Sequence, residues 1–158
     1  MRRALSLLLP MLLFGTAGCG GDSTGPKPPA YEDIDGTYAG VMAGTSQGIS
    51  ANLLFGFTIG QADGDITGSW SFTGKLNDGN TSMDVTGTGS LEGTVTSGRD
   101  PSLTFKIKTS TCPDYEATFS GDYDSDTHRL TVRGPVEFFN YQSCDVGLTY
   151  QATIVLDG

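Results

Sequence analysis

Residues 146–157 read VGLTYQATIVLD, and this stretch decides the fold class of the chain. From Val146 to Leu156 every second residue is apolar, and the residues between them are mostly polar. A period of two is typical of a strand with one buried face, because successive side chains in a β-strand point to opposite sides. The end of the chain is therefore predicted to be a β-strand.

The same alternation recurs along most of the chain. Leu103, Phe105 and Ile107, for example, share one face, and the residues between them are polar. No stretch has the period of an amphipathic helix. The predicted strands are eight runs, at residues 36–44, 50–61, 65–76, 82–97, 101–110, 114–124, 128–139 and 146–157.

The connections between these runs are short and rich in turn-forming residues. Asp63-Gly64 and the NDGN stretch at 77–80 indicate hairpins, because tight turns need residues that tolerate positive φ. Short loops make consecutive strands antiparallel, so we expect an all-β, eight-stranded antiparallel up-and-down meander closed into a small barrel. A β-sandwich is the alternative. Pro135 cannot donate to a ladder and predicts a bulge or an edge in its run.

Alternation does not say which face points inward. With apolar side chains outward, the chain would be an outer-membrane barrel with a polar lumen. Such barrels have aromatic girdles and one set of long loops, and neither is evident here. We therefore expect apolar side chains inside and Thr, Ser and charged side chains toward water.

Composition limits the function classes. The chain has 158 residues and a formal net charge of −9, with 23 glycines. A chain of this length suits one domain. Nucleic acid is excluded as a partner, because its phosphates demand a basic surface.

The N-terminus has the features of an export signal. Arg2 and Arg3 precede an apolar stretch that is too short to span a bilayer, and small residues follow it directly before Cys19. We predict a signal peptide at residues 1–18. Residues 20–29 read GGDSTGPKPP, which predicts a flexible tether within residues 19–33 and one β-barrel domain at 34–158.

The small residues that end at Cys19 resemble the lipobox of bacterial lipoproteins. That resemblance implies that Cys19 is lipidated and becomes the mature N-terminus. Its expected partner is the membrane, reached through this lipid. We expect an exported, lipid-anchored protein, at the outer membrane if the cell has one, with its domain facing the periplasm or the cell surface.

Two short motifs resemble those of calycin barrels. Gly36-Thr37-Tyr38 is similar to the G-x-W signature that opens lipocalins, and the TGSW stretch ending at Trp70 resembles a strand opening of avidins. The resemblance implies a small barrel that can hold a ligand. It argues against biotin, because avidins surround biotin with several Trp residues and this chain has one.

Cys112 and Cys144 are predicted to form a disulfide. Pairing is the default for two thiols in an exported domain. In an up-and-down barrel, both also lie at the same rim. A redox-active pair is the alternative, and it lacks the CxxC spacing.

Motifs that suggest catalysis or metal binding have simpler interpretations. The GTSQG stretch at 44–48 matches GxSxG but lies in a predicted hairpin instead of a strand-to-helix turn. Asp122, Asp124 and Asp126 resemble the start of a calcium loop without its later Gly and Glu. His128 is the one histidine and is expected to be exposed. We predict no enzyme, no cofactor and no metal site.

Two functions stay open. The first is binding of a small apolar ligand in the barrel lumen, for which inward Gly87, Gly89 and Gly93 could leave space, or else only let the strand bend. The second is a surface or structural interaction module with a packed core. The side chains expected to line a ligand site are Trp70, Phe55, Phe57, Phe105 and Tyr150.

Overall fold

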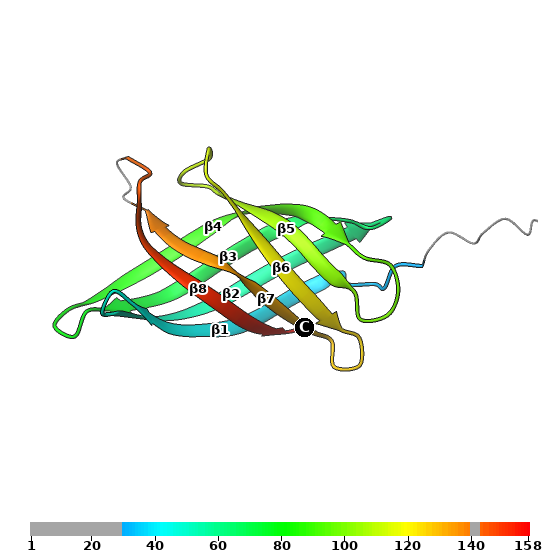
Figure 1. Cartoon of the computed structure of the whole chain (residues 1–158), viewed down its shortest axis with the longest axis horizontal. Coiled ribbons are helices and arrows are strands. Elements are labelled where there is room, and N and C mark those ends of the chain that lie inside the picture. The colour runs from blue at the N-terminus through cyan, green and yellow to red at the C-terminus, as the bar shows by residue number, and fades with distance from the viewer. Residues whose placement is uncertain (1–29, 140–142) are drawn as a thin grey trace, which may run out of the picture.

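The chain forms a closed antiparallel β-barrel, as predicted (Figure 1). The computed structural model describes residues 30–139 and 143–158, so the predicted leader, Cys19 and most of the tether lie outside the described residues. Each strand pairs with the next, and the last returns to the first. The strands are β1 (Gly36–Ser46), β2 (Ile49–Ala62), β3 (Asp65–Asn77), β4 (Ser82–Val95), β5 (Ser102–Thr109), β6 (Glu116–Asp124), β7 (Arg129–Phe139) and β8 (Val146–Asp157).

Two of the hairpins use tight two-residue turns. Asp63 and Gly64 between β2 and β3 both have positive φ, at 53° and 92°. Gln47 and Gly48 between β1 and β2 do the same, at 52° and 81°. Two consecutive positive φ angles match the right-handed twist of the flanking strands. The GTSQG stretch is therefore the end of a hairpin, as expected.

Apolar side chains point inward and polar ones point outward, as expected. Along β8, Leu148, Tyr150, Ala152, Ile154 and Leu156 are buried, whereas the residues between them are half-buried or exposed. No polar or charged residue is buried in the described part of the chain. The lumen is therefore an apolar core.

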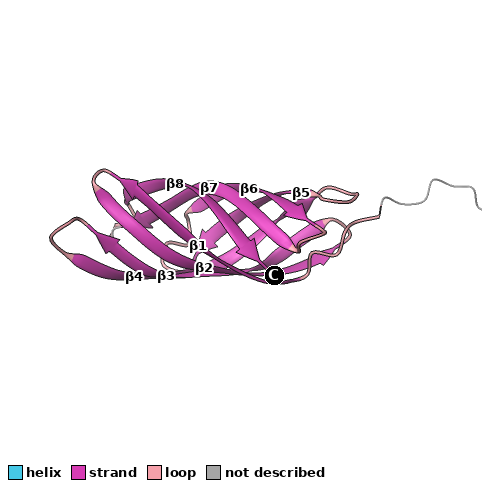
Figure 2. Ribbon diagram, turned by 90° about the horizontal axis from the view of Figure 1, so that it is seen from below, coloured by secondary structure: helices cyan, strands magenta, loops and turns pink. Residues whose placement is uncertain are grey.

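The two ends of the barrel differ. The disulfide Cys112–Cys144 joins the β5–β6 loop to the β7–β8 loop, which lie at one end that we call the disulfide rim. The first described residues lie at the opposite rim of the barrel, where Tyr31 pairs with Gly98 of the β4–β5 connection. Figure 2 shows this long barrel from the side, with the entering segment at one end.

The barrel wall is notched at the disulfide rim, because β5 and β6 are short. The β4–β5 ladder ends at Gly89↔Thr109, although β4 continues to Ser82. The β6–β7 ladder ends at Ser120↔Arg133. Beyond it, β7 pairs with β8 alone.

Pro135 lies in this part of β7, which pairs with β8 on one side and with no strand on the other. It is opposite Gln151 of β8, and no β6 residue pairs with it. This confirms the expectation of an edge, and a bulge follows between Phe138 and Phe139. Val146, at the start of β8 beyond the bulge, is exposed, although alternation placed it with the inward residues.

The closing ladder between β1 and β8 is also short. It consists of Ala39↔Asp157, Gly40↔Leu156 and Val41↔Val155. Toward the disulfide rim the two strands are joined instead by a side chain, since Ser46 Oγ donates to the Thr149 carbonyl over 2.8 Å.

Within the described residues, no helix is long and apolar enough to cross a membrane.

Candidate ligand cavity at the barrel mouth

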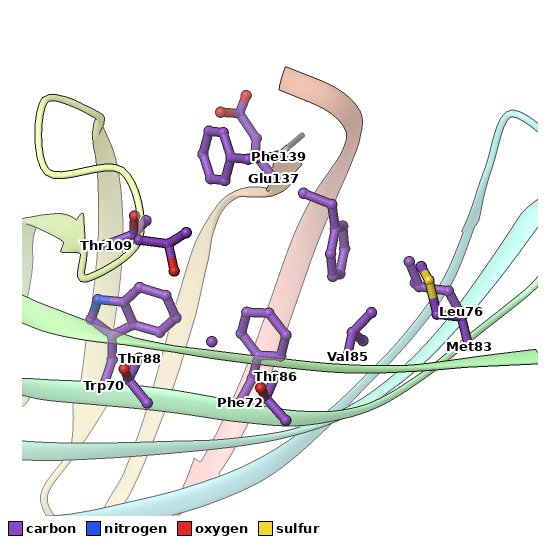
Figure 3. A pocket seen from close by; sticks show the side chains of 13 residues that line it. Trp70, Phe72, Leu76, Met83, Val85, Thr86, Thr88, Thr109, Glu137 and Phe139 are labelled. Carbon is purple, nitrogen blue, oxygen red and sulfur yellow. The ribbon is translucent and has the colours of Figure 1, made fainter. Parts of the chain in front are cut away.

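A cavity of about 100 Å³ opens at the disulfide rim, where the wall is notched. Its floor comes from β3 and β4, and its other walls come from the ends of β5 and β7 and from the β5–β6 loop. Figure 3 shows Trp70, Phe72 and Val85 along one side and Phe139 across from them. The lining residues are Trp70, Phe72, Leu76, Met83, Val85, Thr86, Gly87, Thr88, Thr109, Thr111, Glu137, Phe138 and Phe139.

Aromatic rings form two adjoining walls of the cavity. The rings of Trp70 and Phe72 are nearly parallel, with 17° between their planes and 6.0 Å between their centroids. Phe138 stands at 72° to Phe72, with centroids 5.6 Å apart. Trp70 and Phe72 therefore form one aromatic wall, and Phe138 stands at a steep angle to it.

Glycines on β4 leave room for these rings beside the strand. A Cβ on Gly87 would come within 2.4 Å of the Phe72 ring, and one on Gly89 within 2.6 Å of Trp70 Nε1. Similarly, a Cβ on Gly93 would lie 2.5 Å from Phe105 Cβ. Aromatic side chains from neighbouring strands therefore fill most of the space beside these glycines, and of the three only Gly87 lines the cavity.

Trp70 is held in place by its indole N–H. Only 6% of the residue is exposed, and Nε1 donates to the Lys108 carbonyl oxygen over 3.1 Å. A buried indole N–H needs such a partner. The ring is therefore fixed to the end of β5, and its other edge lies at the cavity.

Polar groups at the cavity are few. Glu137 is the one charged residue among those that line it. Burial, followed by the nearby Glu137 carboxylate, raises the pKa of Tyr115 well above its ordinary value. Thr109 Oγ1 accepts the backbone N–H of Cys112 over 2.9 Å, which connects the cavity wall to the disulfide.

Deeper in the lumen the remaining space is small. A second cavity of about 20 Å³ lies below the notch between β6 and β7 and is lined by Phe55, Phe57 and Trp70, among others. About 20 Å³ holds little more than one water molecule. The lumen is therefore filled by side chains, and the usable space lies at the mouth.

The predicted ligand residues are thus divided between three places. Trp70 lines both cavities, while Phe55 and Phe57 line only the small one. Phe105 lies in the filled part, stacked on Phe119 at 5.8 Å. Tyr150 lines neither cavity, and its ring packs against Phe138 at 5.9 Å while its hydroxyl donates to the Ile49 carbonyl.

Phe138 and Phe139 are cavity residues that the sequence analysis did not identify. They lie at the end of β7, where no β6 residue covers them. The unequal lengths of the predicted strands were the available signal, since runs 101–110 and 114–124 are shorter than 82–97. The wall has its notch where a strand is shorter than its neighbour, and the mouth of the cavity lies at this notch.

The residues of the other motifs take part in local hydrogen bonds and ion pairs. Asp122 pairs with Arg133, Asp126 with Arg99, and Asp124 accepts backbone N–H groups of its own turn. His128 is exposed, and its Nδ1 lies 2.9 Å from the Tyr123 hydroxyl. In the described part of the chain, no three His, Cys, Asp or Glu residues lie close enough together to hold a metal ion.

The fold and the site together define a small closed β-barrel with a packed lumen and an aromatic cavity at its disulfide-bonded mouth. Comparison of the chain with protein-family models, with curated proteins and with solved structures finds no match.

Proposed function

We propose that this protein binds a small apolar ligand at the mouth of its barrel. The observation that carries the proposal is the cavity of about 100 Å³ walled by Trp70, Phe72 and Phe138. For comparison, an engineered apolar cavity of about 150 Å³ accepts benzene. The ligand is therefore a single small apolar group, or a longer molecule that projects through the opening.

The rim supports access to this cavity from solvent. Met83 lines it and is 59% exposed, and Phe138 and Phe139 are half-buried. These three side chains give the opening an apolar edge. Met is also flexible enough to fill the opening or move aside from it.

The proposal includes a lipid anchor at Cys19 and a calycin-like mode of action, in which a barrel presents a ligand at its open end. The lipobox resemblance supports the anchor, and the eight-stranded closed barrel is compatible with the calycin comparison. The anchor is tested separately from ligand binding. Full-length protein should partition into the detergent phase on extraction, and a Cys19→Ala variant should stay in the aqueous phase.

Trp70 provides the test of ligand binding, because it is the one Trp in the chain and it lines the cavity. Titration of the purified protein with small apolar compounds should quench or shift its emission saturably. A matched variant, Val85→Phe, fills much of the cavity without adding a second Trp and should weaken or abolish the response. If a broad panel of apolar compounds gives no saturable response, the proposed function is wrong.

The alternative is an interaction module with a packed core. The filled lumen favours it, since Phe105, Leu130, Ile154 and Leu156 are almost completely buried. This alternative predicts no ligand response at Trp70. Both functions predict a blue-shifted emission, so the decision depends on the response to added compounds.

A further inference from the structure

We propose that the mouth cavity selects a small quaternary or methylated ammonium group over an uncharged group of the same shape. This inference rests on the proposed function, since it names the chemical class of the ligand at the same cavity. Three observations carry it, namely the ring arrangement, the charges at the lining and the size of the cavity.

The rings are arranged as in an aromatic cage. The faces of aromatic rings are negative, and rings on several sides of a cation attract it together. Trp70 and Phe72 supply the floor, Phe138 stands at 72° to it, and Phe139 lies across the cavity in Figure 3. Among these ring types, Trp attracts a cation most strongly.

The charges at the lining have the sign that a cation needs. Among the lining residues none is a Lys, Arg or His, and the carboxylate of Glu137, which accepts the Thr149 hydroxyl over 3.4 Å, lies at the outer edge of the cavity in Figure 3. The nearby lysines of the outer wall are engaged elsewhere, because Lys75 pairs with Asp84 and Lys108 pairs with Glu92. The whole chain has a net charge of −9, which also favours the approach of cations.

The same lining disfavours anionic ligands. A fatty acid or another carboxylate would bring its charge toward Glu137, with no lysine or arginine among the lining residues to pair with it. The volume of about 100 Å³ suits one compact head group, with the remainder of the ligand projecting through the mouth. A trimethylammonium group has this form, since it is compact, apolar on its outside and positively charged.

Choline and 3,3-dimethylbutan-1-ol are the probes that test the inference. They have the same shape, and a carbon atom in the alcohol replaces the quaternary nitrogen of choline. With purified full-length protein at low salt, choline should shift Trp70 emission saturably with an affinity about tenfold higher than that of the alcohol. Added salt should reduce this difference.

Phe139→Leu tests the cage without adding a polar group. It should lower the affinity for choline severalfold and leave that for the alcohol nearly unchanged. Tyr31→Leu is the matched control, because it also removes a partly exposed ring but lies at the opposite rim. Should Phe139→Leu fail to fold, Glu137→Gln carries the test, with Glu32→Gln, next to Tyr31 at the opposite rim, as its charge-matched control.

The outcomes separate the two proposals. If the alcohol binds as tightly as choline, the ammonium inference is wrong and apolar binding stands. If neither compound nor any apolar compound changes Trp70 emission, both proposals fail. If Glu137→Gln and Glu32→Gln lower the choline affinity equally, recognition is a matter of net charge, and the cage at the mouth is refuted.

Discussion

At the scale of single residues, the barrel depends on pairs of a glycine and an aromatic ring from the adjacent strand. Gly89 is opposite Trp70, and Gly87 is opposite Phe72. In each pair the ring occupies the space that a side chain would need if another residue replaced the glycine. Covering a strand glycine with a neighbouring ring is a known way to stabilise curved sheets. Here it also sets the floor of the cavity.

Gly89→Ala should therefore destabilise the protein. Its Cβ would lie 1.8 Å from the Lys108 carbonyl oxygen and 2.6 Å from Trp70 Nε1, so both strand and ring must shift. We expect a loss of about 1–3 kcal/mol in the free energy of unfolding, measured with urea. Gly60→Ala is the control, since its nearest atom would be 3.9 Å away and the expected change is within about 0.5 kcal/mol. Equal effects of the two substitutions would contradict this role of Gly89.

At the scale of elements, the lengths of the strands determine where the wall is open. β5 and β6 have 8 and 9 residues, whereas β4 has 14. The disulfide ties the loop after β5 to the loop after β7, next to the notch that these short strands leave. Thr109 and Thr111 precede Cys112 and line the cavity. The bond therefore holds one side of the mouth in place.

Replacement of both cysteines, Cys112→Ser with Cys144→Ser, should cost about 3–4 kcal/mol of unfolding free energy in the chain-entropy model. The closed segment is long, with a sequence separation of 32. Urea unfolding of the native protein with and without a thiol reductant measures the effect. The reductant should lower the stability of the native protein and leave that of the double variant unchanged. A native protein insensitive to complete reduction would contradict the stabilising role.

The sequence predicts the strands better than it predicts the cavity. Alternation alone placed Leu103, Phe105 and Ile107 inside, because burial of one face produces a period of two within a single strand. The position of Gly89 opposite Trp70 depends on the register of two strands, and no local pattern encodes it. The cavity depends further on the ends of β5 and β7, which lie far apart in sequence. The disulfide was predictable because few cysteines were available.

At the scale of the whole molecule, the two rims are closed by different means. A covalent bond ties loops at the disulfide rim, while apolar packing and buried tyrosines close the opposite rim. There the Tyr38 hydroxyl donates to the Ile34 carbonyl over 2.7 Å, and the Tyr38 ring meets Tyr123 edge to face. Burial, followed by the neighbouring Tyr123, raises the pKa of Tyr38 far above its ordinary value near 10.

This raised pKa predicts a loss of stability at alkaline pH. Above about pH 10, tyrosines of the unfolded chain lose their protons while folded Tyr38 keeps its own. The unfolded state then binds fewer protons, so the free energy of unfolding falls as the pH rises further. Urea unfolding at pH 7, 9 and 11 measures this fall. Tyr38→Phe should be less stable at pH 7 yet lose less between pH 9 and 11, and an identical fall in both proteins would contradict the assignment.

The three-pair ladder between β1 and β8 has a consequence for motion. Elsewhere the chain holds neighbouring strands together by ladders of five to thirteen residue pairs, so this junction has the fewest hydrogen bonds to break. Opening that leaves the core otherwise folded needs the least free energy where contacts are fewest. We therefore expect the barrel to open transiently, on a slow timescale, along the junction between β1 and β8. Its amide hydrogens at Val41 and Val155 should exchange with solvent ahead of those in the middle of β3.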